Sequence, residues 1–269
     1  MQKEVYKITG NDAANYEEHL GPLIFEPAAR ALLSHINRFP ASSILEIASG
    51  TGRLTRHLRE QFPAGSQIIA TDINPDMLDL AQKQLTERSI SFQLADAQLL
   101  PFADQSFDLV VNQFGLMFLP DKKAGLSEAF RVLKPGGHFV FTTWDRTADM
   151  PLFKLLIDET IIPIFKDEDI SRFHTPFALN DPEQLNTWLG ETGFSSHKAN
   201  LMKFTGHADS PMHIVNSYFL QHPLGRQVME KDPSSFDRIA KELEQKLIQH
   251  FGSGPFDIEL KAWLAIGIK

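Results

Sequence analysis

The chain has 269 residues, 42% of them hydrophobic and 22% charged, so it can bury a full core and is not a disordered protein. A net charge of −8 argues against a protein that holds nucleic acid by neutralising phosphates. The absence of cysteine excludes disulfides, thiolate metal sites and cysteine nucleophiles. The histidines show no paired spacing such as His-x-x-x-His, so we expect no metal site.

No segment predicts targeting or membrane insertion. The uncharged, mostly apolar run from Leu109 to Pro120 is far shorter than the roughly 20 residues that span a bilayer. The first residues carry charge but no apolar stretch of the length that a signal peptide needs. We therefore expect a soluble, cytoplasmic protein without a membrane span.

Between about residues 42 and 145, short apolar runs alternate with stretches of helical spacing. The runs, which predict strands, are Ser43–Ala48, Gln67–Thr71, Ser89–Leu94, Phe107–Asn112 and His138–Thr143. The helical stretches repeat apolar residues at intervals of three or four, as at Leu54, Leu58 and Phe62, at Leu78, Ala81 and Leu85, and at Leu126, Phe130 and Leu133. This alternation predicts an α/β protein with a parallel sheet and helices on both of its faces.

Two boundaries in this region carry clear signals. Asn74 can accept from the free N–H groups of a helix that begins at Pro75, and Asp76 suits the positive end of its dipole. The stretch Lys134-Pro135-Gly136-Gly137 predicts the end of the third helix and a turn into the next strand.

After residue 145 the pattern loosens. Asp181-Pro182-Glu183 predicts the start of a helix that ends at Gly193, and an extended stretch through Phe204 follows. Alternation from Asp257 to Ile268 predicts a terminal strand. Two segments fit no sheet position, namely Pro151–Phe177 and His207–Phe251. The second contains an amphipathic helix with Phe236, Ile239, Leu243 and Leu247, closed by Gly252.

The first predicted strand leads directly into Gly50-Thr51-Gly52 and a helix. Glycines let the backbone pass close to a ligand, and a helix N-terminus presents free N–H groups. Glu46 would repel a pyrophosphate, however, and Thr55 stands where the dinucleotide fingerprint has its third glycine. The loop is therefore expected to hold a ligand without phosphates.

Two further acids follow later strands. Asp72 ends the second strand, where a carboxylate can accept both hydroxyls of a ribose. Asp96 follows the third strand and can accept from an exocyclic amine such as adenine N6. Taken singly, Glu46 also fits a lone loop charge and Asp96 a turn residue. Together, three acids at the carboxyl ends of three strands indicate one binding crevice.

The sequence resembles class I S-adenosylmethionine-dependent methyltransferases. Its motifs are most similar to those of the small-molecule branch, which includes ubiquinone and menaquinone biosynthesis enzymes. The resemblance covers residues 40–145 densely and 178–204 loosely. It is carried by five ordered motifs, which are Glu46-Ile-Ala-Ser-Gly-Thr-Gly52, Asp72 in Thr-Asp-Ile-Asn-Pro-Asp-Met-Leu, Asp96-Ala-Gln-Leu-Leu-Pro-Phe102, Phe107-Asp-Leu-Val-Val111 and Arg131-Val-Leu-Lys-Pro-Gly-Gly137.

The resemblance implies a doubly wound, Rossmann-like α/β fold whose seven-stranded sheet is mostly parallel, with the last strand antiparallel. It implies a single methyltransferase domain over 1–269. The core would be about 40–145, 178–204 and 257–269, the N-terminal cap 1–39, and the insertions 146–177 and 205–256.

The implied cofactor is S-adenosylmethionine, with S-adenosylhomocysteine as product. Glu46 would lie near its ammonium, Asp72 at the ribose and Ile73 on the adenine, while residues 112–117 would lie beside the sulfonium. The cofactor-binding residues carried over are Glu46, Ala48, Gly50, Gly52, Asp72, Ile73, Met77, Asp96, Ala97, Gln98, Asn112, Phe114 and Met117. Ala48 departs from the family, where many members have glycine, and we expect binding to survive this change.

The implied reaction is in-line displacement on the activated methyl group. Asn112-Gln113-Phe114-Gly115 departs from the Asn-Pro-Pro-Tyr motif of similar enzymes that methylate amide or base nitrogens. We therefore expect an O, C or S atom of a small apolar molecule as the acceptor, and no nucleic acid. The 21 phenylalanines suit such a pocket. Acceptor-side candidates are Tyr16, Phe25, Phe118, Trp144, Phe173 and Phe177, with His174 as a candidate base.

Two other functions stay open at this point. The glycines and Asp72 also fit a nicotinamide-dependent dehydrogenase on a similar fold, although Glu46 and Thr55 speak against it. A protein that binds the cofactor without catalysis would share every motif named above.

Overall fold

The computed structural model describes residues 11–86, 89–220 and 222–269. They divide into two compact units. Unit 1 consists of the described residues up to Pro27, of Arg146–Thr175 and of Lys203–Lys261. Unit 2 consists of Ala28–Asp145, Pro176–Met202 and Ala262–Lys269.

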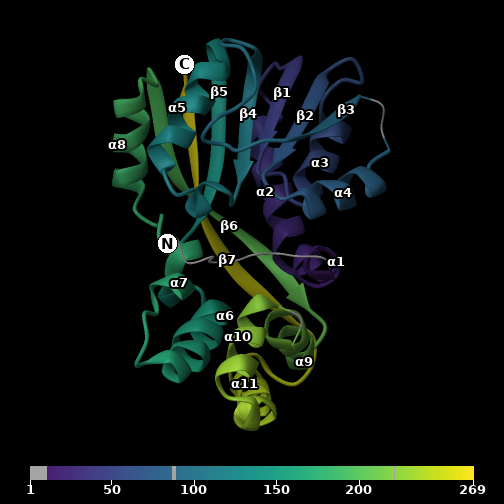
Figure 1. The fold of residues 1–269 in the computed structure, drawn as a ribbon, viewed down its shortest axis with the longest axis vertical. Coiled ribbons are helices and arrows are strands. Elements are labelled where there is room, and N and C mark those ends of the chain that lie inside the picture. The colour runs from purple at the N-terminus through teal and green to yellow at the C-terminus, as the bar shows by residue number, and fades with distance from the viewer. Residues whose placement is uncertain (1–10, 87–88, 221) are drawn as a thin grey trace. The chain divides into compact units, whose positions relative to one another are not determined.

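The sheet has seven strands (Figure 1). They are β1 (Ser43–Ile47), β2 (Gln67–Asp72), β3 (Ile90–Leu94), β4 (Phe107–Gln113), β5 (Leu133–Trp144), β6 (Ser196–Ala208) and β7 (Phe256–Ile268). Their order is β3-β2-β1-β4-β5-β7-β6. Pairing is parallel from β3 across to β5, and β7 runs antiparallel to β5. The predicted mostly parallel sheet with an antiparallel last strand is therefore confirmed.

The strand order explains why a binding crevice is expected at the carboxyl ends of the central strands. The chain winds outward from β1 through β2 to β3, then returns to the other side of β1 with β4. Loops that leave β1 and β4 at their carboxyl ends therefore part in opposite directions and leave a crevice between them.

Helices of unit 2 cover this sheet. They include α2 (Glu26–Ile36), which begins in unit 1, as well as α3 (Arg53–Gln61), α4 (Pro75–Gln84), α5 (Lys122–Val132) and α8 (Pro182–Thr192). α3 and α4 contact β2, whereas α5 contacts both β5 and α8. Because the central strands are covered on both faces, consecutive residues such as Leu109, Val110 and Val111 are completely buried.

The predicted helix boundaries are confirmed where a cap was expected. The Asn74 side chain accepts a hydrogen bond from the backbone N–H of Asp76 at 2.9 Å, with Pro75 in the first turn. Asp181 caps α8 in the same way, accepting from Glu183 at 3.0 Å, and Gly193 ends that helix with a φ of 110°. A side chain in place of this glycine hydrogen would be strained at such a φ.

Two strands are longer than the sequence pattern predicts. β5 begins at Leu133 rather than His138, because Leu133 already pairs with Phe107 and a register shift follows before the main ladder. Gly136 also donates to the carbonyl of Lys269 at 2.8 Å, so the glycine stretch stays beside the sheet. β6 continues to Ala208 instead of ending at Phe204.

Unit 1 is mainly helical. Its α-helices are α1 (Asn11–Asn15), α6 (Pro151–Phe153), α7 (Ser171–His174), α9 (Pro211–Ile214), α10 (Pro223–Lys231) and α11 (Phe236–Phe251). Three of its segments are π-helical, namely η1 (Tyr16–Phe25), η4 (Lys154–Ile161) and η7 (Val215–Leu220). The predicted amphipathic helix is confirmed as α11, which buries Phe236, Ile239, Leu243 and Leu247. The Phe236 ring stacks on Phe219 with a centroid separation of 4.7 Å.

Candidate functional site

The loop after β1 is held against the end of β2. The backbone N–H of Ser49 donates to the Thr71 carbonyl at 2.9 Å, and that of Gly50 donates to the Asp72 carboxylate at 2.8 Å. Ala48 and Gly50 both have left-handed backbones, with φ of 54° and 57°. Alanine rarely adopts this conformation, so the turn is strained at Ala48 and relaxed at Gly50.

The two glycines of this loop serve different purposes. A Cβ atom built on Gly50 would meet no heavy atom within 4 Å, so Gly50 faces open space. A Cβ on Gly52 would lie 2.8 Å from Leu85 Cδ1 and 3.1 Å from Ala81 Cβ. Gly52 therefore lets the start of α3 pack closely against α4 and the residue after it, while Gly50 leaves room beside the loop.

The two predicted acids of β1 and β2 are buried in this region. Glu46 accepts a hydrogen bond from Thr55 Oγ1 at 2.5 Å, and both residues are inaccessible to solvent. Burial raises the pKa of Glu46 to about 8; the hydrogen bond from Thr55 opposes the rise, and the charge of Asp72 adds to it. Burial also raises the pKa of Asp72, against hydrogen bonds from backbone N–H groups that include Asn74 and Gly50. The pair therefore forms a buried acidic centre behind the glycine loop.

The loops after β2 and β3 carry the next candidates. Ile73 is 67% exposed, which is unusual for a large apolar side chain. Asp96 accepts from the backbone N–H of Gln98 at 2.8 Å and from its side-chain amide, while Gln98 Oε1 accepts from Asp121 N–H at 2.8 Å. Ala97 is buried. Asp96 and Gln98 thus belong to one ordered turn, and Ile73 offers an exposed apolar side chain.

Asn112, at the end of β4, is buried and fully engaged with backbone. Its Nδ2 donates to the Ile47 carbonyl at 2.8 Å. Its Oδ1 accepts from Gly115 at 3.2 Å and from Leu116 at 2.9 Å. The amide therefore joins the end of β1 to the turn that follows β4.

Phe114 follows with a left-handed backbone, at a φ of 58°. A bulky side chain in this conformation is an outlier, and such strain concentrates at functional positions. Its ring lies parallel to that of Trp144, with centroids 3.9 Å apart and an interplanar angle of 5°. Its N–H donates to the carbonyl of Thr142 at 3.2 Å. Two of the predicted site aromatics are therefore brought together at the ends of β4 and β5.

The other predicted residues are placed as follows. In unit 2, Met77, Met117 and Phe177 are buried, and Phe118 is 46% exposed. In unit 1, Tyr16 stacks on Phe25 with centroids 4.7 Å apart, and His174 ends α7 half-buried.

Phe173 is fully buried in unit 1. It packs on Phe165 with centroids 4.8 Å apart, and Arg172 lies 4.5 Å over its ring. This environment accounts for Phe173 by packing alone. The acceptor roles of all these residues stay predictions.

Two residues of the site have structural roles that the sequence did not predict. Thr55 bonds to the buried Glu46, and a polar residue on the same helix face as Leu54 and Leu58 is the signal that a buried partner was needed. Gly115 permits the close turn after β4, and its only signal is a glycine three residues after an asparagine that ends a strand.

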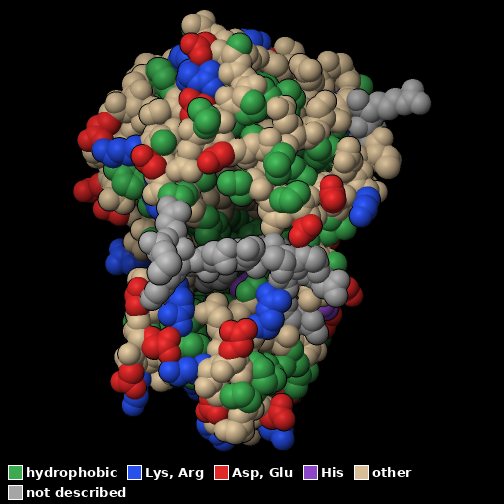
Figure 2. Space-filling model, viewed as in Figure 1, with side chains coloured by type: hydrophobic (Ala, Val, Ile, Leu, Met, Phe, Trp, Pro, Cys, Tyr) green, Lys and Arg blue, Asp and Glu red, His purple; other side chains and the backbone are tan. Residues whose placement is uncertain are grey.

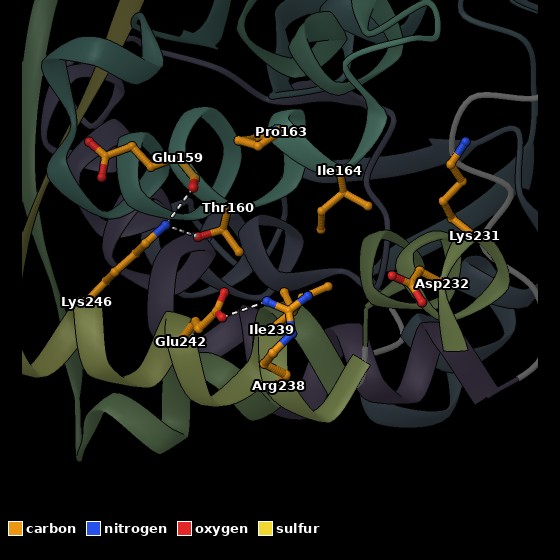
Figure 3. Close-up of a pocket in the computed structure, with 10 residues that line it drawn as sticks. All are labelled: Glu159, Thr160, Pro163, Ile164, Lys231, Asp232, Arg238, Ile239, Glu242 and Lys246. Carbon is orange, nitrogen blue, oxygen red and sulfur yellow. Dashed lines mark hydrogen bonds and ion pairs between the residues drawn. The ribbon is translucent and has the colours of Figure 1, made fainter. Parts of the chain in front are cut away.

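Unit 1 also contains a cavity of about 480 Å³ (Figure 3). Its lining residues are Glu159, Thr160, Pro163, Ile164, Lys231, Asp232, Arg238, Ile239, Glu242 and Lys246. Each basic side chain already has a protein acceptor. Lys246 bonds to the Glu159 carbonyl at 2.6 Å, Arg238 to Glu242 at 2.6 Å, and Lys231 to Glu168 at 2.5 Å. The basic side chains of this cavity are therefore engaged within the protein.

On the face shown in Figure 2, outside its grey atoms, acidic and basic side chains are interspersed. No helix in the described part of the chain has both the length and the apolar character needed to cross a membrane. Within residues 11–86, 89–220 and 222–269, no group of three or more histidine and carboxylate side chains is arranged to hold a metal ion.

Comparisons with known proteins find methyltransferases. The family model described as "Methyltransferase domain" matches residues 45–141. The ubiquinone/menaquinone biosynthesis C-methyltransferase UbiE of Stenotrophomonas maltophilia (strain K279a) is 35% identical over 178 residues, which cover 60% of this chain and 70% of the relative. An uncharacterized protein of Mycobacterium tuberculosis, Rv1405c, is 32% identical over 126 residues, covering 45% of this chain and 44% of that protein.

Solved structures show the same fold at low sequence identity. Phosphoethanolamine N-methyltransferase 2 of Haemonchus contortus, solved with phosphomonomethylethanolamine and S-adenosylhomocysteine, aligns with a TM-score of 0.60 at 20% identity. That alignment covers 96% of this chain and 56% of the nematode chain. The YcgJ protein of Bacillus subtilis aligns with a TM-score of 0.58 at 18% identity, covering 89% of this chain and 98% of YcgJ.

Proposed function

Because this chain belongs to the class I S-adenosylmethionine-dependent methyltransferases, the family of the UbiE C-methyltransferases, we propose that it methylates a small apolar molecule. The cofactor is S-adenosylmethionine and the product S-adenosylhomocysteine. The observation that carries the proposal is the hydrogen bond from the Gly50 N–H to the Asp72 carboxylate. It holds a carboxylate that can accept from ribose hydroxyls beside an open glycine loop.

The residues around the loop suit this cofactor. Gly50 faces open space, so a ligand can approach its backbone. Asp72 accepts from the backbone N–H groups of Gly50, Asn74 and Ile73, and a carboxylate has about four acceptor sites, so it keeps acceptor capacity for a ribose hydroxyl. The buried Ser49 hydroxyl has no hydrogen-bond partner in the described part of the chain, so the loop retains a polar atom for a ligand.

The roles assigned to the side chains follow from their chemistry. Glu46 would stabilise the ammonium of the cofactor, and Asp72 the ribose hydroxyls. Ile73 would cover the adenine with its exposed side chain, next to Met77, while Asp96, Ala97 and Gln98 would line its edge. Ala48, Gly50 and Gly52 would surround the methionine part. Phe114 and Met117 would complete the pocket on the side of β4, and Asn112 would hold the backbone beside them.

The bound cofactor supplies a methyl group on a positively charged sulfur, which is already reactive toward nucleophiles. The protein therefore contributes alignment and the exclusion of water rather than an obligatory catalytic group. Phe114 and Trp144 suit this task, because their stacked rings form a rigid apolar wall with few rotatable bonds.

The acceptor is proposed to be apolar, with O, C or S as the accepting atom. Relatives named as C-methyltransferases favour carbon, and their names make quinol-type rings the first compounds to test. Tyr16, Phe25, Phe118, Phe173 and Phe177 remain the aromatic candidates for the acceptor pocket. His174 is a half-buried candidate for the base that takes a proton from the acceptor. A cytoplasmic location and the exclusion of nucleic acid are part of the same proposal.

A dehydrogenase function is not supported, since neither the family model nor the relatives described above point to one.

A measurement of methyl transfer separates an enzyme from a protein that binds the cofactor without turnover. The protein is incubated with methyl-labelled S-adenosylmethionine and a set of phenols, quinols and thiols, and both the label transferred to the acceptor and the S-adenosylhomocysteine formed are quantified. Acceptor-dependent product supports the proposal. Tight cofactor binding with no product across the whole set contradicts methyl transfer to this class of molecule.

A further inference from the structure

Two side chains of β4 tie this strand to β1, one at each end. At the amino end, Asp108 accepts from the backbone N–H groups of Ser42 at 3.0 Å and Ser43 at 2.9 Å. At the carboxyl end, Asn112 donates to the Ile47 carbonyl at 2.8 Å. Only the second tie reaches the loops that carry the proposed cofactor-binding residues.

The Asn112 amide acts on both loops at once. Its nitrogen holds Ile47, the residue before the strained Ala48. Its oxygen accepts the N–H groups of Gly115 and Leu116, which shapes the turn around the left-handed Phe114. The side chain is 3% exposed, so water is a poor substitute for these partners.

Direct packing adds a second connection between the same loops. A Cβ atom on Gly115 would lie 2.5 Å from Ala48 Cβ and 2.5 Å from Asn112 Nδ2. Real Cβ atoms do not approach so closely, so only glycine lets the turn after β4 rest against Ala48. The loop after β1 and the turn after β4 therefore share one tight contact and one buried hydrogen-bonding amide.

We propose that Asn112 and Gly115 are positioning residues that set the spacing between the loop after β1 and the turn after β4, and thereby preorganise both for the cofactor. This inference rests on the proposed function, because it assigns the loop after β1 to the methionine part and residues 114–117 to the side of the methyl group. In it, Asn112 acts through the backbones of Ile47, Gly115 and Leu116 and not by its own contact with the cofactor.

The first test compares Asn112→Ala with Asp108→Asn, a matched control on the same strand. Both variants lose a tie between β4 and β1, and both should lower the unfolding midpoint. Binding of S-adenosylhomocysteine by calorimetry separates them. We expect the Kd of Asn112→Ala to rise about 10-fold, as for the loss of a buried hydrogen-bond partner, and that of Asp108→Asn to stay within twofold of the wild type.

The second test is a double-mutant cycle on folded protein that leaves the Asn112 amide in place. Gly115→Ala should weaken S-adenosylhomocysteine binding about 10-fold, because the new methyl group pushes the loops apart. Adding Ala48→Gly removes one of the two colliding atoms and should restore part of the affinity that Gly115→Ala loses, with the Ala48→Gly single variant completing the cycle. This non-additivity is a property of residues in contact and would not arise from two independent losses of stability.

The outcomes are distinct. If wild-type protein does not bind S-adenosylhomocysteine, the proposed function fails before any variant is compared. If wild-type protein binds it and Asn112→Ala binds equally well despite a lower midpoint, Asn112 is merely structural and the inference is overturned. Additive effects of Ala48→Gly and Gly115→Ala would likewise overturn it, whereas weakened binding with partial rescue supports it.

Discussion

The Asp72 carboxylate accepts a hydrogen bond from the backbone N–H of Gly50 at 2.8 Å, joining the end of β2 to the loop after β1. The two residues are 22 positions apart in sequence. Because the carboxylate orients the glycine loop and retains some acceptor capacity, one side chain both shapes the crevice and offers an acceptor for a ribose hydroxyl.

Replacing Asp72 with Asn should weaken cofactor binding strongly. The amide retains one acceptor oxygen but loses the charge that favours two hydroxyl donors, so we expect at least a 10-fold rise in the Kd for S-adenosylhomocysteine by calorimetry. Asp79→Asn on the exposed face of α4 is the matched control and should bind as the wild type does. Equal affinities of the two variants would rule out Asp72 as a ligand-binding residue.

Replacing Glu46 with Gln should change how the stability of the protein depends on pH. The pKa of Glu46 is raised to about 8 in the folded protein, so the folded state holds its proton more tightly than the unfolded state. Ionisation of Glu46 should therefore lower the free energy of unfolding of the wild type as pH rises from about 4.5 to 8. Glu46→Gln lacks this decline, and thermal melts should show its advantage growing toward pH 8.

Cofactor affinity should change with pH in the opposite sense. An ammonium group is stabilised by ionised Glu46, so wild-type binding of S-adenosylhomocysteine should tighten between pH 6 and pH 8.5. The Glu46→Gln variant should bind more weakly and with less dependence on pH. A wild-type Kd that is flat over this range would contradict the placement of the ammonium near Glu46.

Replacing Ala48 with Gly should stabilise the protein. Its φ of 54° costs alanine about 1 kcal/mol, of which part is offset by the greater freedom of glycine in the unfolded chain. We expect a net gain of roughly 0.5 kcal/mol in denaturant unfolding. The control, Ala240→Gly inside α11, should lose roughly 1 kcal/mol. A loss at both positions would show that the left-handed turn is not strained.

Removing the Asp108 carboxylate should lower the stability of the folded protein more at neutral pH than at acidic pH. Partial burial alone would raise the pKa of this carboxyl, but hydrogen bonds from Lys134, Ser42 and Ser43 together outweigh it and hold the pKa well below its usual range. Its stabilisation is present above the unfolded pKa of about 4 and is lost as pH falls toward the folded value. The difference in unfolding midpoint between wild type and Asp108→Asn should therefore shrink below pH 4, and a constant difference would contradict this account.

Local signals in the sequence predict much of unit 2. The cap at Asn74, the glycine after α8 and the apolar runs of β1 and β4 each depend on a few neighbouring residues, and the structure places them as expected. The motif order also predicts the acids at the ends of β1 and β2. Such features are readable because the interactions that create them act within a few residues.

The parts that escaped prediction depend on long-range contacts or unusual helical geometry. The hydrogen bond from Asn112 to the Ile47 carbonyl joins residues 65 positions apart, and the sequence near Asn112 does not predict it. The left-handed backbone of Phe114 opposes its local preference. In unit 1, η1, η4 and η7 are π-helical, so a search for apolar residues at the spacing of an α-helix does not detect them.

The most direct test of the central claim is calorimetric titration of the wild-type protein with S-adenosylhomocysteine, with NAD as the comparison ligand. We expect saturable one-to-one binding with a Kd in the micromolar range, and no heat from NAD. No binding of S-adenosylhomocysteine at about 100 μM, or binding of NAD in its place, would contradict it.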